Sequence, residues 1–434
     1  MAEAQRKQQE KDRGLLYREM ADRLVPYYQP ILALDTRRIM GYEALGRIRT
    51  EDGVRSVGPF FADKTVSMAE QIRVDRLLRE QALARFALAA SDSEQSKLFI
   101  NLKPSWIYQT FAATGELPTL RLLEKYAIDP RRIVIEITEE SFLGPMEQLR
   151  AVVDLYRERG CLIAIDDVGS GFSSMDRIAQ IEPHILKIDI HMLQQSERHS
   201  GYYGVMRSFS TLADQIGASL LVEGVETEQD LERAIEIGAR YVQGFLFAPA
   251  SASFLPPDAF GALLEAGLHR RRSRLLQVER HWSAEAERLQ HVVEAVWRRA
   301  CGGDGVIDEA ADEFIELLLR ELELELELAV TVAVAVDSRC HRLYLCSKDG
   351  IQLSSNYKRE SGGTWSKEPQ YRGRNWSWRP YFVPLSNQFA DRPRAAVSQT
   401  YTDLDSFDRI RTISVPVGDG CILFVDAAEL EGER

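Results

Sequence analysis

The segment IAIDDVGSG (residues 163–171) joins a short apolar run to two consecutive aspartates. Six other apolar runs in the chain also end in an acid, an amide or a lysine. They are YEALGR with Glu43, FINLKPS with Asn101, IVIEITEE with Glu136, ILKIDI with Lys187, LLVEGVE with Glu223 and YVQGF with Gln243. Such groups are costly to bury at strand ends unless they converge on ions or a substrate. The pattern therefore predicts an enzyme site built from the ends of buried strands.

Segments with helical periodicity separate these runs, at residues 72–89, 146–159, 203–216 and 228–237. A further strand candidate, YYQPILAL at residues 27–34, opens the series. Alternating strands and helices describe parallel βαβ units, and eight of them predict a TIM-like (β/α)8 barrel with its active groups at the C-terminal ends of the strands. The alternative is an open doubly wound sheet, which would gather its ligands at one switch point.

Residues 27 to about 249 resemble an EAL domain, a family of cyclic di-GMP phosphodiesterases named after the tripeptide that stands here as Glu43-Ala44-Leu45. The resemblance is carried by an ordered set of short signatures. They are YQPI at 28–31, EALGR at 43–47, EITE at 136–139, KID at 187–189 and EGVE at 223–226. The resemblance implies a barrel that hydrolyses cyclic di-GMP to linear 5'-pGpG.

The resemblance also implies a site for two metal ions. Glu43, Asn101, Glu136 and Asp166 would hold one ion, and Asp166 would bridge to a second ion that Asp167 also binds and Glu223 approaches. Because all of these ligands are oxygen donors, Mg²⁺ or Mn²⁺ suits them better than zinc. Ca²⁺ is expected to inhibit.

The remaining site residues follow from the same resemblance. Lys187 would contact the attacking water and complete the catalytic group with Glu223, Asp166 and Asp167. Its alternative role is a structural ion pair inside the barrel. The expected substrate contacts are Gln29, Leu45, Arg47, Asp189 and Gln243, although a lone Arg near a strand end is more often a surface ion pair.

The loop DDVGSGFSS (residues 166–174) contains two glycines that permit a tight turn after the metal ligands. In the family this loop organises metal binding and the dimer contact, and Glu139 would anchor it. The common family form has an aromatic residue at Val168, threonine at Ser170 and tyrosine at Phe172. These conservative departures predict a preserved loop shape, and they leave the rate open because an aromatic residue and a hydroxyl of the family form are absent. The resemblance also implies a homodimer.

Composition narrows the class of protein further. The formal net charge of −12 argues against general binding of a nucleic acid polymer. The sequence holds no apolar run of membrane-spanning length, and its first residues are charged, so we expect a cytoplasmic protein. The five cysteines form no C-x-x-C pair and are expected to be reduced.

The pattern changes beyond Pro257. Residues 263–299 have helical periodicity with one apolar stripe, which suits a connector between domains or a coiled-coil contact. The basic cluster HRRRSR (269–274) is interpreted as a solvated helix face rather than as a surface for nucleic acid or membrane. The glycines of Gly302–Gly305 end this helix. A helix is then expected at about 308–322, and strands at 330–336, 342–347, 395–399, 409–416 and 420–425, forming a mostly antiparallel α+β sheet with helices on one side.

This second region resembles the PAS/Cache-like sensor domain that follows some EAL domains, an architecture of the YkuI type. WSWRPYF (376–382) and VSQTYTD (397–403), followed by ISVPV (413–417), carry the resemblance. The resemblance implies a small-molecule pocket formed by Trp378, Arg379, Tyr381, Tyr401 and Asp403, for a polar or zwitterionic ligand. Alternatively, the aromatic residues belong to the core and the arginine is a structural brace.

We therefore expect a regulated cyclic di-GMP phosphodiesterase. Its parts are an N-terminal helical segment (1–22), an EAL domain (23–262), a connecting helix (263–300) and a sensor domain (301–434). The alternative is a catalytically weak EAL protein that acts as a cyclic di-GMP receptor or a protein-interaction module. A G-G-D-E-F cyclase signature is absent, because Gly302-Gly303-Asp304-Gly305 lacks its acid.

Overall fold

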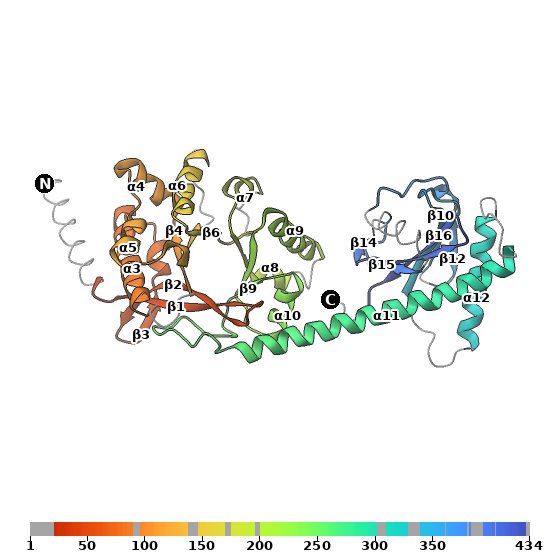
Figure 1. Cartoon of the computed structure of the whole chain (residues 1–434), viewed down its shortest axis with the longest axis horizontal. Helices are drawn as coiled ribbons and strands as arrows, with labels where there is room; N and C mark the ends of the chain where they lie inside the picture. Colours follow the sequence, from red (N-terminus) through yellow and green to blue (C-terminus); the bar gives the residue numbers. More distant parts are fainter. Residues whose placement is uncertain are drawn as a thin grey trace. The chain divides into compact units, whose positions relative to one another are not determined.

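The computed structural model describes residues 21–89, 96–137, 146–169, 175–195, 200–301, 310–328, 339–360, 362–379, 382, 394–403 and 405–430. The chain divides into two compact units between Arg271 and Arg272 (Figure 1). The first unit holds the strand-end residues that the sequence singles out, and the second holds the predicted sensor region.

Eight strands of the first unit close into a barrel. Their order around the ring is β1 (Leu24–Ala33), β9 (Tyr241–Val242), β8 (Ser219–Glu223), β7 (Ile185–Asp189), β6 (Leu162–Ile165), β5 (Ile133–Ile137), β4 (Lys97–Leu102) and β2 (Arg38–Thr50). Pairing of β2 with β1 closes the ring, and β3 (Gly53–Ser56) extends β2 as a hairpin. The predicted barrel is confirmed, and the open sheet is excluded.

The first strand departs from the parallel pattern that the sequence predicts. β1 is antiparallel to both of its neighbours, β2 and β9, whereas the other neighbouring strands of the ring are parallel. Only a short turn separates β1 from β2, and Arg37 adopts a left-handed φ of 56° within it. A turn of this length joins antiparallel strands, because a parallel crossover needs a dozen or more residues.

The helices of the first unit lie outside the strands (Figure 1). They are α2 (Gly58–Ala62), α3 (Met68–Ala89), α4 (Pro104–Thr114), α5 (Pro118–Lys125), the 3₁₀ turn η2 (Pro130–Arg132), α6 (Met146–Glu158), α7 (Met175–Ile181), α8 (Ile190–Gln195), α9 (Ser200–Ile216) and α10 (Glu228–Glu236). The largest hydrophobic core lies between these helices and the strands. A smaller core fills the barrel with Ile31, Ala33, Phe99, Val134, Ala164, Ile185, Leu221 and Tyr241. This inner core identifies the strand positions that face the barrel axis.

The long helix α11 (Gly261–Cys301) contributes residues to both units. Within the first unit, Arg270 pairs with Glu228 and Glu232 of α10 at 2.5 and 2.8 Å, and Arg271 pairs with Glu236 at 3.5 Å. Glutamates of the protein itself therefore pair with these two members of the basic cluster, which gives them a structural role that needs no nucleic acid or membrane.

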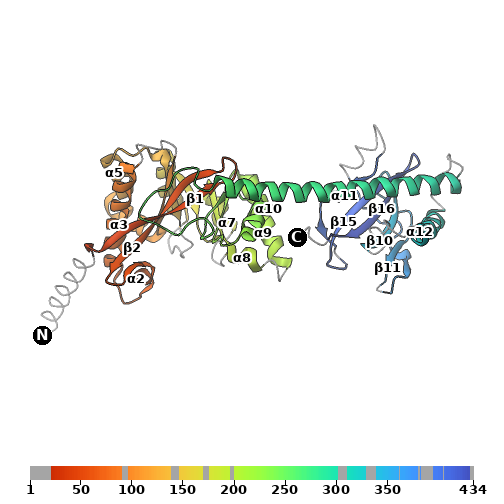
Figure 2. The same cartoon turned by 90° about the horizontal axis from the view of Figure 1, so that it is seen from below.

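The second unit contains a seven-stranded antiparallel sheet. The order is β12 (Trp365–Glu368), β11 (Asn356–Arg359), β10 (Cys340–Ser347), β16 (Cys421–Ala428), β15 (Arg409–Val417) and β13 (Ala396–Val397), and β14 (Tyr401–Thr402) also pairs with β15. One face packs on α11 and on α12 (Ala311–Leu328) around Trp282, Val293 and Phe314 (Figure 2). The 3₁₀ turn η3 (Pro369–Tyr371) follows β12.

This arrangement confirms the predicted antiparallel sheet with helices on one face. The sequence did not predict β11 and β12, and α12 continues to Leu328, beyond the expected end at residue 322. The strand predicted at residues 330–336 lies outside the described residues.

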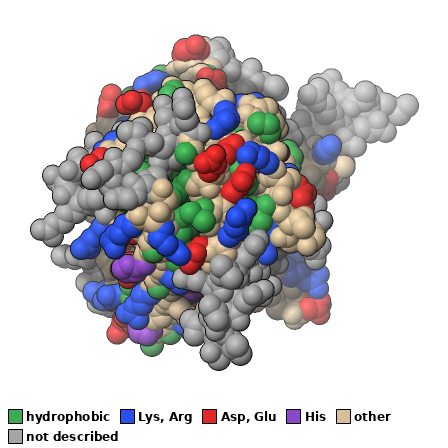
Figure 3. Space-filling view, turned by 90° about the vertical axis from the view of Figure 1, so that its right-hand side faces the viewer, with side chains coloured by type: hydrophobic (Ala, Val, Ile, Leu, Met, Phe, Trp, Pro, Cys, Tyr) green, Lys and Arg blue, Asp and Glu red, His purple; other side chains and the backbone are tan. Residues whose placement is uncertain are grey.

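The surface in Figure 3 mixes both signs of charge. Lys and Arg side chains alternate there with Asp and Glu, and hydrophobic side chains form small groups between them. In the described part of the chain, no helix combines the length and the apolar character needed to cross a bilayer.

Candidate metal centre

Most of the predicted site residues of the barrel form one inward-facing layer. On six strands, the polar residue stands two positions after the residue that fills the barrel interior. The pairs are Phe99 and Asn101, Val134 and Glu136, Ala164 and Asp166, Ile185 and Lys187, Leu221 and Glu223, and Tyr241 and Gln243. Because strand side chains alternate with a period of two, the second member lies on the inner side, one layer nearer the C-terminal rim. The antiparallel strand β1 supplies Gln29, which lies opposite Glu43 of β2.

Lys187 occupies the centre of this layer and is almost completely buried. Its Nζ lies 2.6 Å from Glu136 Oε1, 2.6 Å from Glu223 Oε1 and 3.1 Å from Asp166 Oδ1. Burial alone would lower the pKa of this lysine, but the surrounding carboxylates outweigh it and hold the pKa well above its usual range. The structure thus shows the ion pairs that the structural alternative predicts, and the catalytic role of Lys187 stays a prediction.

Glu136 is the most deeply buried acid of the layer, with no measurable exposure. Neither carboxylate oxygen accepts a directed hydrogen bond, although Lys187 lies close to one of them. Burial raises the pKa of Glu136 well above its usual range, and the nearby Glu43, Asp166 and Glu223 act in the same direction against Lys187. A buried carboxylate without directed donors is unfavourable in a folded protein unless a further positive charge reaches it.

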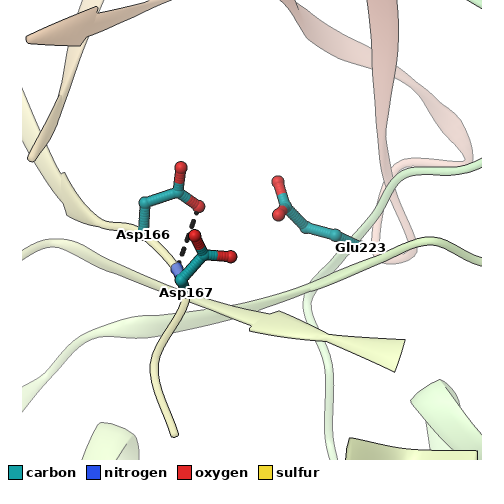
Figure 4. A group of neighbouring side chains, drawn as sticks. All are labelled: Asp166, Asp167 and Glu223. Carbon is teal, nitrogen blue, oxygen red and sulfur yellow. Dashed lines mark hydrogen bonds between the residues drawn. The ribbon is translucent and has the colours of Figure 1, made fainter. Parts of the chain in front are cut away.

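In the part of the chain that the structure describes, Asp166, Asp167 and Glu223 form a group of potential ligands, with one oxygen from each lying within 4.8 Å of the others. Figure 4 shows the two aspartates at the end of one strand and Glu223 opposite them, with all three carboxylates facing the same space. Asp167 has a left-handed φ of 55°, and its backbone N–H donates to Asp166 Oδ1 at 3.0 Å. Burial, Asp166 and Glu43 together raise the pKa of Glu223 to about 8, against the effect of Lys187.

Glu43 is held by two side-chain amides. Asn101 Nδ2 donates to Glu43 Oε1 at 2.9 Å, and Gln243 Nε2 donates to Glu43 Oε2 at 2.7 Å. Gln243 Nε2 also lies 3.3 Å from Gln29 Oε1, while Gln29 Nε2 donates to the carbonyl of Ala248 at 3.2 Å. Gln243 and Gln29, which the sequence analysis assigned to substrate, therefore also fix the orientation of a proposed metal ligand.

The other expected substrate contacts lie on the rim. Leu45 and Arg47 follow Glu43 on the same face of β2, and Arg47 donates to the carbonyl of Gly46 at 3.0 Å. Asp189, at the end of β7, is in register with Glu223 of β8. Its exposed carboxylate accepts from the backbone N–H of His191 at 2.6 Å.

Two glycines allow the loops at the site to approach closely. A Cβ on Gly244 would lie 2.0 Å from the carbonyl oxygen of Val225, in the loop that follows Glu223. Gly169 has a φ of 97°, and a Cβ there would lie 2.3 Å from Met192 Sδ. The sequence analysis did not single out Gly244, although a glycine directly after a strand-end glutamine is the available signal. Glu139 and residues 170–174 of the loop lie outside the described residues.

The residues of this layer fit divalent cations. Glu43, Glu136, Asp166, Asp167 and Glu223 supply five carboxylates, which Lys187 alone cannot neutralise. All of these donors, and the amide of Asn101, are oxygen ligands of the kind that Mg²⁺, Mn²⁺ and Ca²⁺ prefer. The two buried oxygens of Glu136, which accept no directed hydrogen bond, also favour a site for a divalent cation.

The described members of the predicted sensor pocket each contact different partners. The Arg379 guanidinium lies 4.7 Å from the Trp378 ring centre and 5.8 Å from that of Trp376. Asp403 receives both nitrogens of Arg342 at 3.2 and 3.1 Å, and the Tyr401 hydroxyl lies 2.6 Å from Thr412 Oγ1. Arg342 is thus the partner of Asp403, which favours a structural role for this acid.

Tyr381 lies outside the described residues, so the structure gives the positions of only four of the five residues proposed to form the pocket. Trp378 is 66% exposed, unlike a core residue. A ligand role for Trp378, Arg379, Tyr381, Tyr401 and Asp403 stays a prediction.

Comparisons with known proteins extend the resemblance to both units. The EAL domain pattern matches residues 15–250, and the pattern of the EAL-domain associated signalling protein domain matches residues 307–429. The uncharacterized EAL-domain containing protein YkuI of Bacillus subtilis is 33% identical over 409 residues, covering 93% of this chain and 94% of the relative.

Two further similarities bear on chemistry. The crystal structure of Bacillus subtilis YkuI, in complex with substrate c-di-GMP and calcium, superposes with a TM-score of 0.80 and 32% identity, covering 95% of this chain and 98% of that one. The cyclic di-GMP phosphodiesterase RocR of Pseudomonas aeruginosa is 32% identical over 225 residues, or 51% of this chain and 56% of RocR.

Proposed function

Because the chain belongs to the EAL-domain family, we propose that it is a metal-dependent phosphodiesterase that hydrolyses cyclic di-GMP to linear 5'-pGpG. The observation that carries this proposal is the cluster of Glu136, Asp166 and Glu223 around Lys187, with Glu136 buried and without directed hydrogen bonds. The carboxylates of Glu43 and Asp167 add to the negative charge of this region. Such an excess of negative charge suits a protein that binds divalent cations and, through them, an anionic substrate.

The residues divide into two proposed ligand groups. Glu43, Asn101, Glu136 and Asp166 would hold one ion, while Asp166, Asp167 and Glu223 would hold the second. Mg²⁺ or Mn²⁺, when bound, would supply positive charge to the phosphodiester and lower the pKa of the attacking water. We assign Ca²⁺ to inhibition, because it accepts irregular coordination with more ligands than the octahedral Mg²⁺.

The other side chains position the reacting groups. Lys187 holds a positive charge within reach of Glu136, Asp166 and Glu223, where its ammonium can donate to a water or a phosphate oxygen. Gln29 and Gln243 keep Glu43 oriented through the hydrogen bonds described above. Arg47 offers a forked donor to a phosphate, and Asp189 and Leu45 border the same mouth.

The second candidate function is a cyclic di-GMP receptor with weak turnover. The observation that favours it is the composition of the loop at Val168, Ser170 and Phe172, where the family form has other residues. The described ligand set favours the enzyme, because a receptor needs no metal-activated water.

We propose further that the protein is a homodimer and that the second unit regulates the first. The support for regulation is α11, whose residues join α10 through ion pairs in the first unit and the hydrophobic core in the second. A small polar or zwitterionic ligand of the second unit would act through this helix.

The direct test is turnover of cyclic di-GMP by the purified full chain with Mg²⁺ or Mn²⁺, followed by chromatographic detection of pGpG. Asp166→Asn should abolish hydrolysis without unfolding the barrel, and Asp214→Asn, at an exposed position on α9, should leave it unchanged. Binding without turnover by the unchanged protein would establish the receptor function. Near-normal turnover by Asp166→Asn at limiting metal would refute the ligand assignment.

A further inference from the structure

The antiparallel ribbon of β1 and β2 continues beyond the metal layer. Gln29 lies opposite Glu43, and the next pairs toward the ribbon's outer end are Tyr27 with Leu45 and Val25 with Arg47. The barrel strands on either side stop before these pairs, since β9 contacts β1 only at Leu32 and Ala33 and β4 contacts β2 only as far as Glu43. Farther out, Ser251 bridges to Tyr28, and β3 pairs with β2 from Arg47 onward. The ribbon therefore stands above the rim as one wall of the mouth.

The orientation of Tyr28, the next residue along the strand, shows on which face of the ribbon Tyr27 lies. Tyr28 is buried toward the helices, where its hydroxyl donates to the carbonyl of Ala82 at 3.0 Å and its ring lies 4.4 Å from that of Phe254. Because successive strand residues face opposite sides, Tyr27 shares the inner face with Gln29 and Ile31. Its side chain is partly exposed, as expected for a residue that lines an opening.

The surface around Tyr27 combines aromatic, aliphatic and cationic groups. Leu45 is its cross-strand partner, and Arg47, two residues farther along the same face of β2, is its diagonal neighbour across the ribbon. Two residues along a strand span about 7 Å. This separation between Tyr27 and the Gln29–Glu43 layer is similar to the distance that a ribose spans between a base and its phosphate.

We propose that Tyr27 is a stacking surface for a guanine base of the dinucleotide whose phosphate lies at the metal layer. This inference rests on the proposed function and adds a residue that selects a nucleotide over a simple phosphodiester. Leu45 would support the base from the adjacent strand, and Arg47 would remain directed toward phosphate. Stacking of a base on an aromatic side chain tolerates a change at the ring's substituent but not loss of the ring.

Three variants separate stacking from other roles of the tyrosine. Tyr27→Ala removes the ring, Tyr27→Phe keeps the ring and removes only the hydroxyl, and Tyr202→Ala removes an exposed tyrosine from α9. Affinity is measured with cyclic di-GMP and Ca²⁺, where turnover is not expected. Rate is measured with Mg²⁺ or Mn²⁺ on cyclic di-GMP and on bis(p-nitrophenyl) phosphate, a phosphodiester without bases.

Tyr27→Ala should bind cyclic di-GMP about 5- to 150-fold more weakly, the usual effect of losing one base–aromatic stack. Its rate on bis(p-nitrophenyl) phosphate should stay within about twofold of the unchanged protein. Tyr27→Phe and Tyr202→Ala should retain normal affinity. The fluorescence of a 2-aminopurine analogue of the cyclic dinucleotide should be quenched when the analogue binds the unchanged protein. The quenching should be weaker when it binds Tyr27→Ala.

Two results would overturn the inference while leaving the proposed function intact. Normal affinity in Tyr27→Ala would show that no base stacks there, and an equal loss in Tyr27→Phe would assign the effect to the hydroxyl and Arg47. Failure of the unchanged protein to bind or hydrolyse cyclic di-GMP would instead refute the proposed function, and the inference with it.

Discussion

Replacing Glu136 by glutamine should stabilise the metal-free protein and at the same time remove most of its response to metal. Glu136 is fully buried, and no directed hydrogen bond reaches either of its oxygens. The substitution keeps the shape of the side chain and removes its charge. Lys187 does not become an unpaired buried cation, because Glu223 at 2.6 Å and Asp166 at 3.1 Å still surround its Nζ.

The expected size of the effect follows from these contacts. Relief of one poorly solvated carboxylate should stabilise the metal-free barrel by about 1–3 kcal/mol. For a unit of this size, each kcal/mol shifts the melting temperature by about 2–4 °C, so a rise of at least about 2 °C is expected. Conversely, a metal at 100 times its dissociation constant stabilises a native protein by about 2.7 kcal/mol, and Glu136→Gln should lose most of this gain.

Thermal unfolding in EDTA and in a titration of Mg²⁺, Mn²⁺ or Ca²⁺ measures both effects. The melting temperatures should cross, with Glu136→Gln above the unchanged protein in EDTA and below it at high metal. Glu147→Gln, on the exposed face of α6, is the matched control and should follow the unchanged protein at all metal concentrations. A variant that melts lower in EDTA and gains as much from metal as the unchanged protein would refute the argument that Glu136 is a strained, metal-dependent acid.

Two further predictions concern Lys187 and the second unit. Lys187→Ala should still bind cyclic di-GMP with Ca²⁺ but hydrolyse it at least ~100-fold more slowly, because its ammonium lies among the proposed ligands; equal losses of affinity and rate would make it a structural residue. Burial raises the pKa of Asp426 to about 6, against the opposing effect of Arg342, so its contribution to stability is present below about pH 4 and is lost as the pH rises through 6. Asp426→Asn should therefore stabilise the second unit above pH 6, by up to about 3 kcal/mol, with no difference near pH 4. Unfolding followed from pH 4 to 8 checks this, and lower stability of the variant at pH 8 would contradict it.

The strand-end residues could be found from sequence because the signal is local. An apolar run followed by Asn101, Glu136 or Asp166 indicates both the strand and the place where it ends, and neighbouring parallel strands bring such ends to one rim. The contacts among those residues could not be predicted. The sequence does not show that Lys187 reaches Glu136, or that Gln243 donates to Glu43, because these contacts depend on the register of strands far apart in the chain.

The second unit was harder to predict for a different reason. β11 and β12 are four-residue strands, NYKR and WSKE, in which charged residues interrupt the apolar pattern. Among the described strands, β12 lies at the edge of the sheet, where charges are tolerated because one side of an edge strand is not paired. The alternating ELELELEL segment carries a period-two signal but is helical to Leu328, and the high helix propensity of both glutamate and leucine accounts for the difference.

The reversed first strand explains why Tyr27 escaped the sequence analysis. In an all-parallel barrel, residues that precede the apolar part of a strand lie at the N-terminal face, away from the site. Because β1 runs antiparallel to β2 and β9, its N-terminal half instead lies at the mouth, so Tyr27 and Gln29 stand beside Leu45 and Glu43. The N-terminal half of β1 therefore forms a wall beside the metal layer. A parallel strand would place that half at the opposite face of the barrel. Its inner-face pairs run outward from Gln29 and Glu43 in the metal layer to Tyr27 and Leu45 nearer the rim. This order puts an aromatic side chain at the position that we propose for a base whose phosphate lies at that layer.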